Sequence, residues 1–332
     1  MTQIEIAELA KNANIYEVAQ KTLNPKYAMN DGEKVVAEQL DEWARKIGET
    51  GNDPEHEIAA FITRTVNDEF YNAPDELMDM LFDRGTIGEF DDYEATVEPI
   101  KNTLVAHEAA KGGNVPASYL DISVLKPQWK NKQLETKLSY VDLRKNGWKS
   151  VALLTDYAMR ALENARFADI FGAIDAGISM GAENYINEAG KTVSQATAEA
   201  LALYVNDRAE GDGVIVALSK YVQQISKLPG FDSDSMLDEI HRTGRLGMYD
   251  GVNLFPISGA KKLATGGLLV PDKRVFGISG KIGTLDMRGE VHTYETMDNN
   301  KEVVNLKIAD FTYGYSFNKD TLENVCKVVI SG

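Results

Sequence analysis

Apolar positions recur at helical spacing along residues 30–51, NDGEKVVAEQLDEWARKIGETG. The apolar stripe is made of Val35, Val36, Leu40, Trp43 and Ile47. Steps of three and four residues keep side chains on one face of a helix, so this stretch predicts an amphipathic helix. The Asn-Asp-Gly start and the closing glycines mark its two ends.

Two further helices are predicted before residue 86. The stretch 53–74 has apolar residues at 58, 61, 62 and 66, with Asp53 as a helix cap and Pro54 in the first turn. The stretch 72–85, NAPDELMDMLFDRG, predicts a short helix that Gly85 ends.

The pattern changes to period 2 on both sides of 108–118, EAAKGGNVPAS. Alternation predicts strands, and Gly112, Gly113 and Pro116 predict a flexible tip between them. A long two-stranded arm is only marginally stable in water, because it buries too little to offset the entropy lost on ordering. Such an arm therefore needs another surface to lie on, which is a first sign of assembly.

The longest helical pattern follows, from Gly147 to Ile186, without a proline. A helix of about 30 residues would be on the order of 45 Å long. Residues 193–260 then predict a small α/β unit: a helix capped by Ser194, a buried strand at 213–218, a helix capped by Ser219 and a helix at 234–244 that stops at Gly244. Asp250-Gly251 is a hairpin-turn signature.

The last part of the chain predicts strands, with a turn at Asn299-Asn300. Aromatic residues alternate at period 2 within DFTYGYSF, so one face of a strand carries all four. Few basic residues accompany them, which favours packing in a core or interface over a base-stacking platform. These aromatic residues are Phe311, Tyr313, Tyr315 and Phe317.

No motif in the sequence specifies catalysis. His56, His107, His241 and His292 are far apart and lack metal-ligand spacing, and Cys326 lies in the apolar strand VCKVVI. The glycines of GRLGMYDG and GISGKIG do not follow a strand while opening a helix, the geometry that holds a phosphate. We therefore expect no catalytic residues, no bound cofactor and no metal ion. We do not expect the protein to be an enzyme.

Charge separates the chain into two parts. Residues 1–100 contain 23 acidic and 8 basic residues, a balance of −15, whereas the other 28 acidic and 27 basic residues give −1 of the total of −16. The acidic part indicates either a solvated helical region or one that repels polyanions or attracts a basic partner. Tight, sequence-specific binding of nucleic acid is disfavoured, because no basic patch with interleaved aromatic residues occurs.

Length and composition are those of a folded protein of two or three compact units. The chain has 332 residues, of which 43% are hydrophobic and 26% charged. Its single cysteine excludes a disulfide within the chain. No apolar run approaches the about 18 residues that a membrane span needs, and no signal peptide is expected at the start.

The succession of these parts resembles the major capsid (head) protein family of tailed bacteriophages. The resemblance lies in the order of its segments: 139–171, SYVDLRKNGWKSVALLTDYAMRALENARFADIF; 213–225, GVIVALSKYVQQI; 235–258, SMLDEIHRTGRLGMYDGVNLFPIS; 268–283, LLVPDKRVFGISGKIG; and 303–317, VVNLKIADFTYGYSF. Residues 1–84 match the family least.

The resemblance implies an α+β fold with an N-terminal arm, an extended β loop, a peripheral domain with a long spine helix, and an axial domain. On this chain the acidic helical N-terminal region would be 1–84, and the extended loop 85–146 with its tip near 108–118. The peripheral domain would combine 147–192 and 261–332, and the axial domain would be 193–260.

The function that the resemblance implies is mechanical. Copies would form hexamers and pentamers that self-assemble into the icosahedral head shell of a tailed phage, around packaged double-stranded DNA that is not bound sequence-specifically. The expected location is the virion, after assembly in the host cytoplasm; portal, scaffolding and decoration proteins are further candidate partners. An encapsulin-type cellular nanocompartment and a nucleotide-binding enzyme that uses the glycine-rich loops stay open as alternatives.

Candidate contacts between subunits lie at the tip of the extended loop and in the axial hairpin. They are Glu108, Lys111, Gly112, Gly113, Asn114, Pro116, Arg245, Met248, Tyr249 and Asp250. Some relatives crosslink a loop lysine to a neighbour's asparagine, for which Lys101, Lys111 and Lys126 are available. A crosslink is not favoured here, because the sequence shows no apolar pocket around these lysines.

Overall fold

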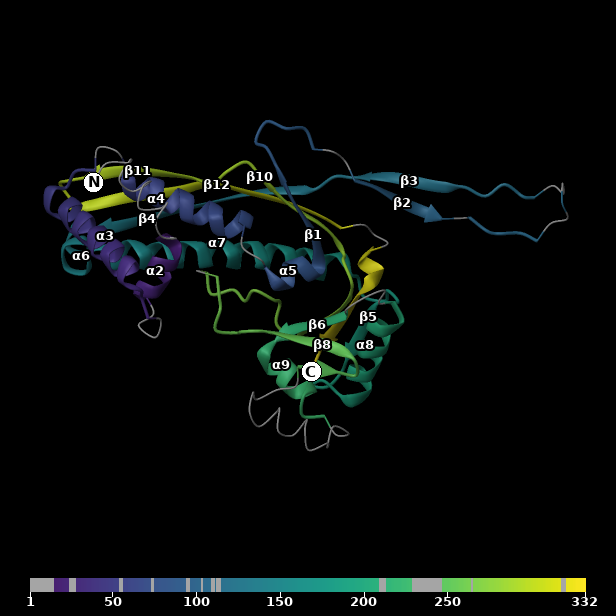
Figure 1. Cartoon of the computed structure of the whole chain (residues 1–332). Coiled ribbons are helices and arrows are strands. Elements are labelled where there is room, and N and C mark those ends of the chain that lie inside the picture. Colours follow the sequence, from purple (N-terminus) through teal and green to yellow (C-terminus); the bar gives the residue numbers. More distant parts are fainter. Residues whose placement is uncertain are drawn as a thin grey trace. The chain divides into compact units, whose positions relative to one another are not determined.

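The computed structural model divides the chain into two compact units (Figure 1). Unit 1 comprises 1–74, 130–166 and 288–312, and unit 2 comprises 75–129, 167–287 and 313–332. The structure describes residues 15–23, 28–53, 56–72, 75–93, 96–102, 104–108, 111, 115–208, 213–228, 247–263, 265–317 and 321–332. The helix predicted at 234–244 and its stop at Gly244 lie outside these ranges.

Unit 1 begins with helices, as predicted. They are α2 (Ile15–Leu23), α3 (Asp31–Thr50), α4 (Glu57–Asn67) and a π-helical turn (Asp68–Asn72). At the start of α3 the Asn30 side chain accepts a hydrogen bond from the Glu33 backbone N–H at 2.8 Å, and the Glu33 carboxylate accepts from the Asn30 N–H at 2.9 Å. This capping box satisfies two backbone donors that the helix itself leaves open. Of the predicted stripe, all but Val35 are buried.

Helix α4 begins later than the sequence predicts. His56 has a left-handed φ of 52°, which an L-residue cannot continue as a helix, so α4 starts at Glu57. Asp53 still serves the helix from outside it, because its carboxylate accepts from the Ile58 N–H at 3.2 Å. Pro54 lies outside the described residues.

The long helix is confirmed as α7 (Trp148–Gly177), which has 30 residues. The short helix α6 (Tyr140–Asn146) precedes it, and Gly147 between them has a φ of 56°. A Cβ at Gly147 would stand 1.8 Å from Asp41, whose carboxylate accepts from the Trp148 N–H at 3.0 Å. Helix α3 thereby caps α7, and only glycine fits between them.

An aromatic cluster fills the core of unit 1. The ring centroids of Trp43 and Trp148 are 5.8 Å apart, and those of Phe61 and Trp148 are 4.4 Å apart. These rings come from α3, α4 and α7, which are distant in sequence. The cluster therefore fixes the first part of α7 against the acidic N-terminal helices.

Strands of unit 1 lie beside α4. Strand β11 (His292–Asp298) pairs antiparallel with β12 (Val303–Phe317), and the predicted turn at 299–302 joins them. Strand β4 (Gln128–Ser139) also pairs with β12. Side chains of α4 accept from backbone N–H groups at the start of β11: Thr63 from Thr293, and Asn67 from Val291 just before the strand, both at 2.9 Å. Helix α4 thus covers an edge that could otherwise pair with another strand.

The larger sheet of unit 2 has six strands among the described residues, in the order β5-β13-β9-β6-β8-β7. They are β5 (Tyr185–Glu188), β6 (Gly213–Leu218), β7 (Met248–Tyr249), β8 (Val252–Ile257), β9 (Arg274–Ser279) and β13 (Val325–Ile330). All residues of β6 are buried, which confirms the predicted buried strand. A short 3-10 helix (Thr321–Asn324) precedes β13.

Helices α8 (Gln195–Arg208) and α9 (Ser219–Ile225) flank β6 and β8 (Figure 1). Ser194 accepts from the Thr197 N–H at 3.3 Å, so the predicted cap of α8 is confirmed. Ser219 does not cap α9: it is the first helical residue, and its hydroxyl donates to the Ile257 carbonyl. The strand ahead of α9 runs directly into the helix, so this hydroxyl ties α9 to β8 instead.

The short third helix is α5 (Glu76–Leu81), and the prediction that Gly85 ends it is wrong. Residues from Phe82 to Ile87 form β1, which lies next to β10 (Gly283–Arg288). A Cβ at Gly85 would stand 2.4 Å from the Asp286 carboxylate. Gly85 therefore permits a close approach within a sheet, a nonlocal role that local sequence does not reveal.

The aromatic strand packs in the interior, as predicted. Phe311, Tyr313 and Tyr315 are buried and Phe317 is half-buried. The Tyr313 hydroxyl donates to the Asp169 carboxylate at 2.6 Å, which gives its buried polar end a partner. Among the described residues, no helix combines the length and apolarity that crossing a membrane requires.

Three carboxyl groups meet where α4 lies on β11. Asp53 and Glu57 are buried, and Glu295 of β11 accepts from the Ala59 N–H at 3.1 Å. Burial, followed by the charge of Asp53, raises the pKa of Glu295 to about 8. Glu295 is therefore protonated in the folded protein at neutral pH, since like charges in a dry site disfavour ionisation.

This raised pKa makes the stability of unit 1 depend on pH. The ordinary value is 4.5, so the stability contributed by the neutral carboxyl is complete below about pH 4.5 and is lost as the pH rises through 8. We expect the free energy of unfolding to fall by up to about 1.4 kcal/mol per pH unit across that window. Glu295→Gln should flatten this dependence in urea titrations, whereas Glu302→Gln, at an exposed carboxyl, should not. Equal slopes for Glu295→Gln and the unsubstituted protein would contradict a buried neutral Glu295.

Candidate assembly surfaces

The predicted arm is present as a two-stranded antiparallel ribbon. Strand β2 (Thr96–Asn102) pairs with β3 (Leu120–Leu125), with Thr96 opposite Leu125 and Asn102 opposite Leu120. The register shifts between Pro99 and Lys101, where proline lacks the N–H that a ladder needs. Neither strand pairs with any other strand in the described part of the chain.

The tip of the arm exposes apolar side chains. Leu104, Val105, Val115 and Tyr119 are between 46% and 60% exposed. The predicted contact residues Glu108, Lys111 and Pro116 are exposed as well, whereas Gly112, Gly113 and Asn114 lie outside the described residues. We call residues 104–119 the arm tip. In the single chain, about half of the surface of these apolar side chains is exposed.

The predicted hairpin at Asp250-Gly251 is confirmed, but its residues differ in exposure. Asp250 and Gly251 have φ of 47° and 81°, and they join Tyr249 to its partner Val252 in a two-residue turn. Met248 is 52% exposed, whereas Tyr249 is only 1% exposed and so is not available on the surface of the single chain. The Asp250 carbonyl accepts from the Asn206 side chain at 2.9 Å, and Arg245 lies outside the described residues.

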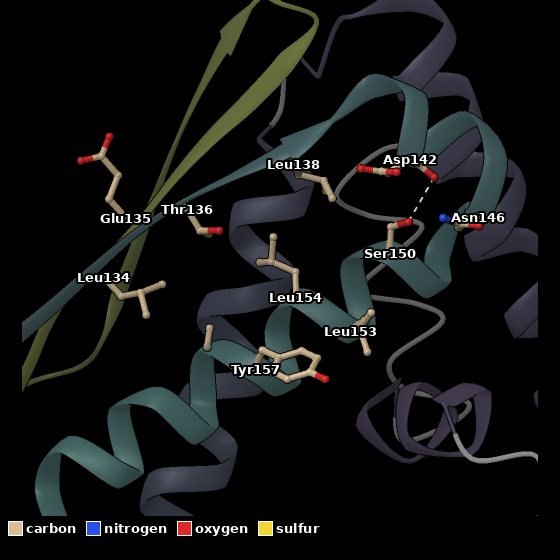
Figure 2. A pocket seen from close by; sticks show the side chains of 11 residues that line it. Leu134, Glu135, Thr136, Leu138, Asp142, Asn146, Ser150, Leu153, Leu154 and Tyr157 are labelled. Atoms are coloured by element: carbon tan, nitrogen blue, oxygen red, sulfur yellow. Dashed lines mark hydrogen bonds between the residues drawn. The ribbon is translucent and has the colours of Figure 1, made fainter. Parts of the chain in front are cut away.

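A groove of about 550 Å³ opens in unit 1 between β4, α6 and α7 (Figure 2). Apolar side chains dominate its lining: Leu134, Leu138, Leu153, Leu154, Tyr157 and Ala158. The Ser150 hydroxyl donates to the Asp142 backbone carbonyl at 3.1 Å, which holds α6 against the start of α7. The charged lining residues are Glu135 and Asp142, both acidic. We call this the β4–α7 groove.

Sequence reasoning did not find this groove, although one signal for it exists. The apolar stripe of α7 includes Leu154 and Ala158, but Leu153 and Tyr157 fall off that stripe. They are 44% and 63% exposed. Large apolar residues beside the buried face of a helix indicate a second contact surface.

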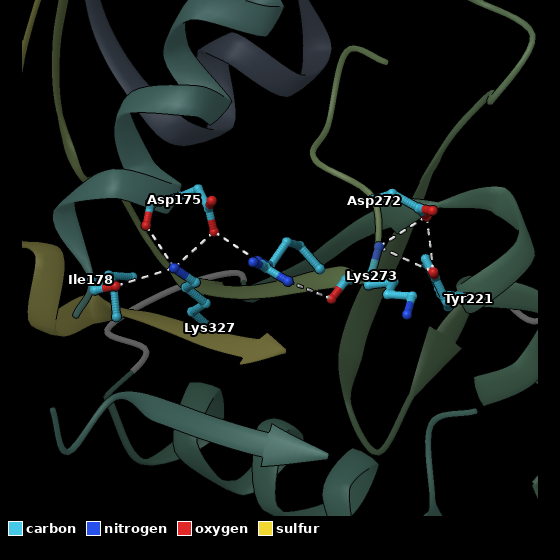
Figure 3. A network of polar contacts seen from close by, with 7 residues as sticks. Asp175, Ile178, Tyr221, Asp272, Lys273 and Lys327 are labelled. Atoms are coloured by element: carbon cyan, nitrogen blue, oxygen red, sulfur yellow. Dashed lines mark hydrogen bonds and ion pairs between the residues drawn. The ribbon is translucent and has the colours of Figure 1, made fainter. Parts of the chain in front are cut away.

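A charged cluster lies in unit 2 at the end of α7 (Figure 3). The Lys327 ammonium donates to the Asp175 and Ile178 carbonyls at 2.6 and 3.1 Å, and it pairs with the Asp175 carboxylate at 2.8 Å. Arg274 binds the same carboxylate at 3.0 Å. A cation on the last carbonyls of a helix stabilises its negative end, so this cluster anchors α7 to β13 and β9.

Another carboxylate performs a similar task for α8. Glu188 accepts from the hydroxyls of Ser194 and Thr197 at 2.5 and 2.6 Å and from two backbone N–H groups. Hydrogen bonds from these hydroxyls, above all, lower the pKa of Glu188 to about 2. The charge lies at the start of a helix, where it is stabilising. Both charged clusters are thus explained by helix ends.

The glycine-rich stretches do not form a phosphate site in the described residues. Gly277 lies within β9, where a Cβ would stand 2.6 Å from Leu201 of α8, and Gly280 forms the turn after β9 with a φ of 68°. These glycines serve packing and chain reversal. Gly244 lies outside the described ranges, so its role stays a prediction.

The three described histidines and the cysteine do not come together in a site. His56, His107 and His292 are exposed, and His241 is outside the described residues. Burial raises the pKa of the Cys326 thiol to about 12. In the part of the chain that the structure describes, no group of three His, Cys, Asp or Glu residues could hold a metal ion.

Comparisons with known proteins give information about the fold. No protein-family model matches the sequence, and no curated protein matches it either. The structure is similar to a chain of the bacteriophage PhiM1 mature capsid, with a TM-score of 0.50 and 10% identity over 75% of this chain and 86% of that one. A chain of Mycobacterium phage Bobi gives 0.51 and 8% identity over 80% and 94%.

A chain of Gordonia phage Cozz gives a TM-score of 0.51 at 10% identity, over 75% of this chain and 85% of that chain. The chain has the fold of tailed-phage major capsid proteins. The fold expected from the order of segments is therefore confirmed, including its α+β class. Which residues make up each domain of the capsid fold stays a prediction.

Within this capsid fold, we expect the Lys327 cluster to be a main anchor of α7. Lys327 is 6% exposed, so replacing it with methionine removes a cation from the helix end and from the half-buried Asp175 carboxylate. Lys327→Met should lower the free energy of unfolding by about 3 kcal/mol in urea titrations.

Lys301→Met is the matched control, because Lys301 pairs with Asp298 at 3.1 Å but is 72% exposed. It should change the free energy of unfolding by less than about 1 kcal/mol. A similar small effect for both variants would show that the buried cluster does not hold α7.

Proposed function

We propose that this chain is the major capsid protein of a tailed double-stranded DNA bacteriophage and that its copies self-assemble, through hexamers and pentamers, into the icosahedral head shell. The observation that carries the proposal is the match to phage chains over 85% to 94% of their length. The role is structural and not enzymatic, and the location is the virion after assembly in the host cytoplasm.

The arm supports self-association on physical grounds. A two-stranded ribbon alone is marginal in water, yet β2 and β3 pair only with each other among the described residues. Burying the exposed apolar tip on another subunit would supply the missing stabilisation, at about 25 cal/mol per Å² of apolar surface. The arm tip and the axial hairpin, with Met248 exposed, are therefore the proposed contacts between subunits.

The charge of the chain agrees with a container for DNA. A net charge of −16 does not favour a phosphate backbone, so packaged DNA would not be held by the shell. The acidic helices are also the part of the chain most suited to a basic partner such as a scaffolding protein. No observation favours an encapsulin-type shell or a nucleotide-binding enzyme.

Deleting Glu108–Ser118 tests whether the arm is needed for assembly. The purified full chain should form capsomers or closed particles in sedimentation velocity and negative-stain micrographs. The deletion should leave the circular dichroism spectrum and the urea midpoint close to those of the full chain, because the removed residues that the structure describes are exposed or half-buried. Particles should be lost.

Two outcomes would contradict the proposal. A full chain that stays monomeric or dimeric at tens of micromolar would exclude a shell protein that assembles alone. A deletion variant that unfolds would show that the arm belongs to the core of its own subunit.

A further inference from the structure

Helix α4 covers the outer edge of β11, which is the last strand of its sheet among the described residues. The Asn67 amide donates to the Val291 carbonyl at 3.0 Å and accepts from the Val291 N–H at 2.9 Å. The Thr63 hydroxyl accepts from the Thr293 N–H at 2.9 Å. These side chains occupy backbone groups that a further strand would bind, so access to this edge depends on where α4 lies.

A pair of carboxyl groups holds the first turn of α4 at the same edge. Glu295 of β11 accepts from the Ala59 N–H at 3.1 Å. Asp53, which is 5% exposed, accepts from the Ile58 N–H at 3.2 Å. A hydrogen bond also joins the two carboxyl groups to each other. The beginning of the helix is therefore attached to the sheet through this pair.

One proton is needed to keep the pair together. Two ionised carboxylates offer only acceptors, so the hydrogen bond between Glu295 and Asp53 exists only while one of them is protonated. Glu295 Oε1 is buried and meets no hydrogen-bond donor among the described residues, and an ionised oxygen in such a place costs free energy. Loss of the proton breaks the hydrogen bond and leaves two like charges in a largely buried contact.

The surroundings of Glu295 favour its protonated form. Burial, followed by the charges of Asp53 and Glu57, raises the pKa of Glu295 to about 8. Glu57 comes from the first turn of α4 and is 3% exposed. On β12 the residue opposite Glu295 is the apolar Leu306. Burial and two acidic neighbours therefore keep the proton on the pair at neutral pH.

Three further titratable groups lie around the pair. Asp298, at the end of β11, pairs with Lys301 at 3.1 Å. Burial, followed by nearby carboxylates, raises the pKa of the Tyr140 hydroxyl, which stays neutral and donates to the Asn299 side chain at 2.7 Å. His56, just before α4, is exposed. None of the three places a cation on the buried carboxyl groups.

We propose that the first turn of α4 is a proton-controlled cover on the edge of β11. With Glu295 protonated, this turn is held on the strand. With Glu295 ionised, the turn separates from the strand and both carboxylates reach water. The outward backbone groups of β11 beside Glu295 are then open to an extended peptide segment. The inference concerns contacts inside unit 1 and is independent of the proposed shell function.

The separation is confined to the first turn, because the next part of α4 is held without charges. Phe61 packs on Trp148 with ring centroids 4.4 Å apart. Thr63 and Asn67 bind the backbone at the start of β11 through a hydroxyl and an amide. These contacts do not titrate, so they keep the later turns of α4 in place when the first turn separates.

Hydrogen exchange of the full chain, measured by mass spectrometry, tests the cover. Residues 57–61 report the first turn of α4, and residues 150–159 of α7 report the core of unit 1. After correction for the intrinsic exchange rate, the protection of 57–61 should fall about tenfold per pH unit between about pH 5 and pH 8, then level off. The reason is a pKa of about 8 in the covered form and the ordinary 4.5 in the open form. Residues 150–159 should stay at least about tenfold better protected at every pH.

Two substitutions separate the proton from the packing. Glu295→Gln keeps an acceptor for Ala59 and a donor for Asp53 but cannot ionise, so the protection of 57–61 should stay constant within about threefold across this range. Asp53→Asn removes the neighbouring charge and lowers the pKa of Glu295, so the fall should end at a lower pH and be smaller in total. Glu302→Gln, at an exposed carboxyl, is the matched control and should behave like the unsubstituted chain.

Three results would overturn the cover. The first is protection of 57–61 that does not change with pH in the unsubstituted chain. The second is the same fall in Glu295→Gln, or in Asp53→Asn, as in Glu302→Gln, which would show that this carboxyl pair is not the cause. The third is equal protection of 57–61 and 150–159 at every pH, which would show that unit 1 opens as a whole.

Discussion

A two-stranded ribbon with an apolar tip is at best marginally stable by itself in water, and this constraint links the other features of the protein. Strands β2 and β3 form such a ribbon, and the described residues at its tip are largely exposed. Under the proposed function, a neighbouring subunit covers this feature in the assembled shell. The capsid fold, the open groove in unit 1 and the exposed hairpin residue Met248 then have a common explanation in assembly.

An arm that lies on another subunit stabilises a shell only if each subunit is itself rigid. The aromatic cluster around Trp148 fixes one end of α7, and the Lys327 cluster fixes the other. Each cluster joins elements that are far apart in sequence. Each therefore fixes its end of α7 to other elements of the same unit. The Lys327 and Glu188 clusters both stabilise helix ends, which agrees with a structural role.

The sequence predicted those elements whose cause is local. The long helix, the capped α3, the arm and the Asp250-Gly251 turn follow from periodicity, caps and turn chemistry. Errors arose where a distant residue or an unusual backbone conformation decides: Gly85 faces Asp286 in a sheet, and a left-handed His56 delays α4. The groove was missed for the same reason, because β4 and α7 meet only in three dimensions. The one local sign of the groove in the sequence is that Leu153 and Tyr157, both large and apolar, lie outside the apolar stripe of α7.

The most direct measurement of the central claim is a cryo-electron microscopy map of particles formed by the full chain, at a resolution that traces the main chain. The account predicts closed particles in which the ribbon formed by residues 96–125 lies on a neighbouring subunit. A map in which the ribbon folds back on its own subunit, or a preparation that contains only dispersed single chains, would contradict it.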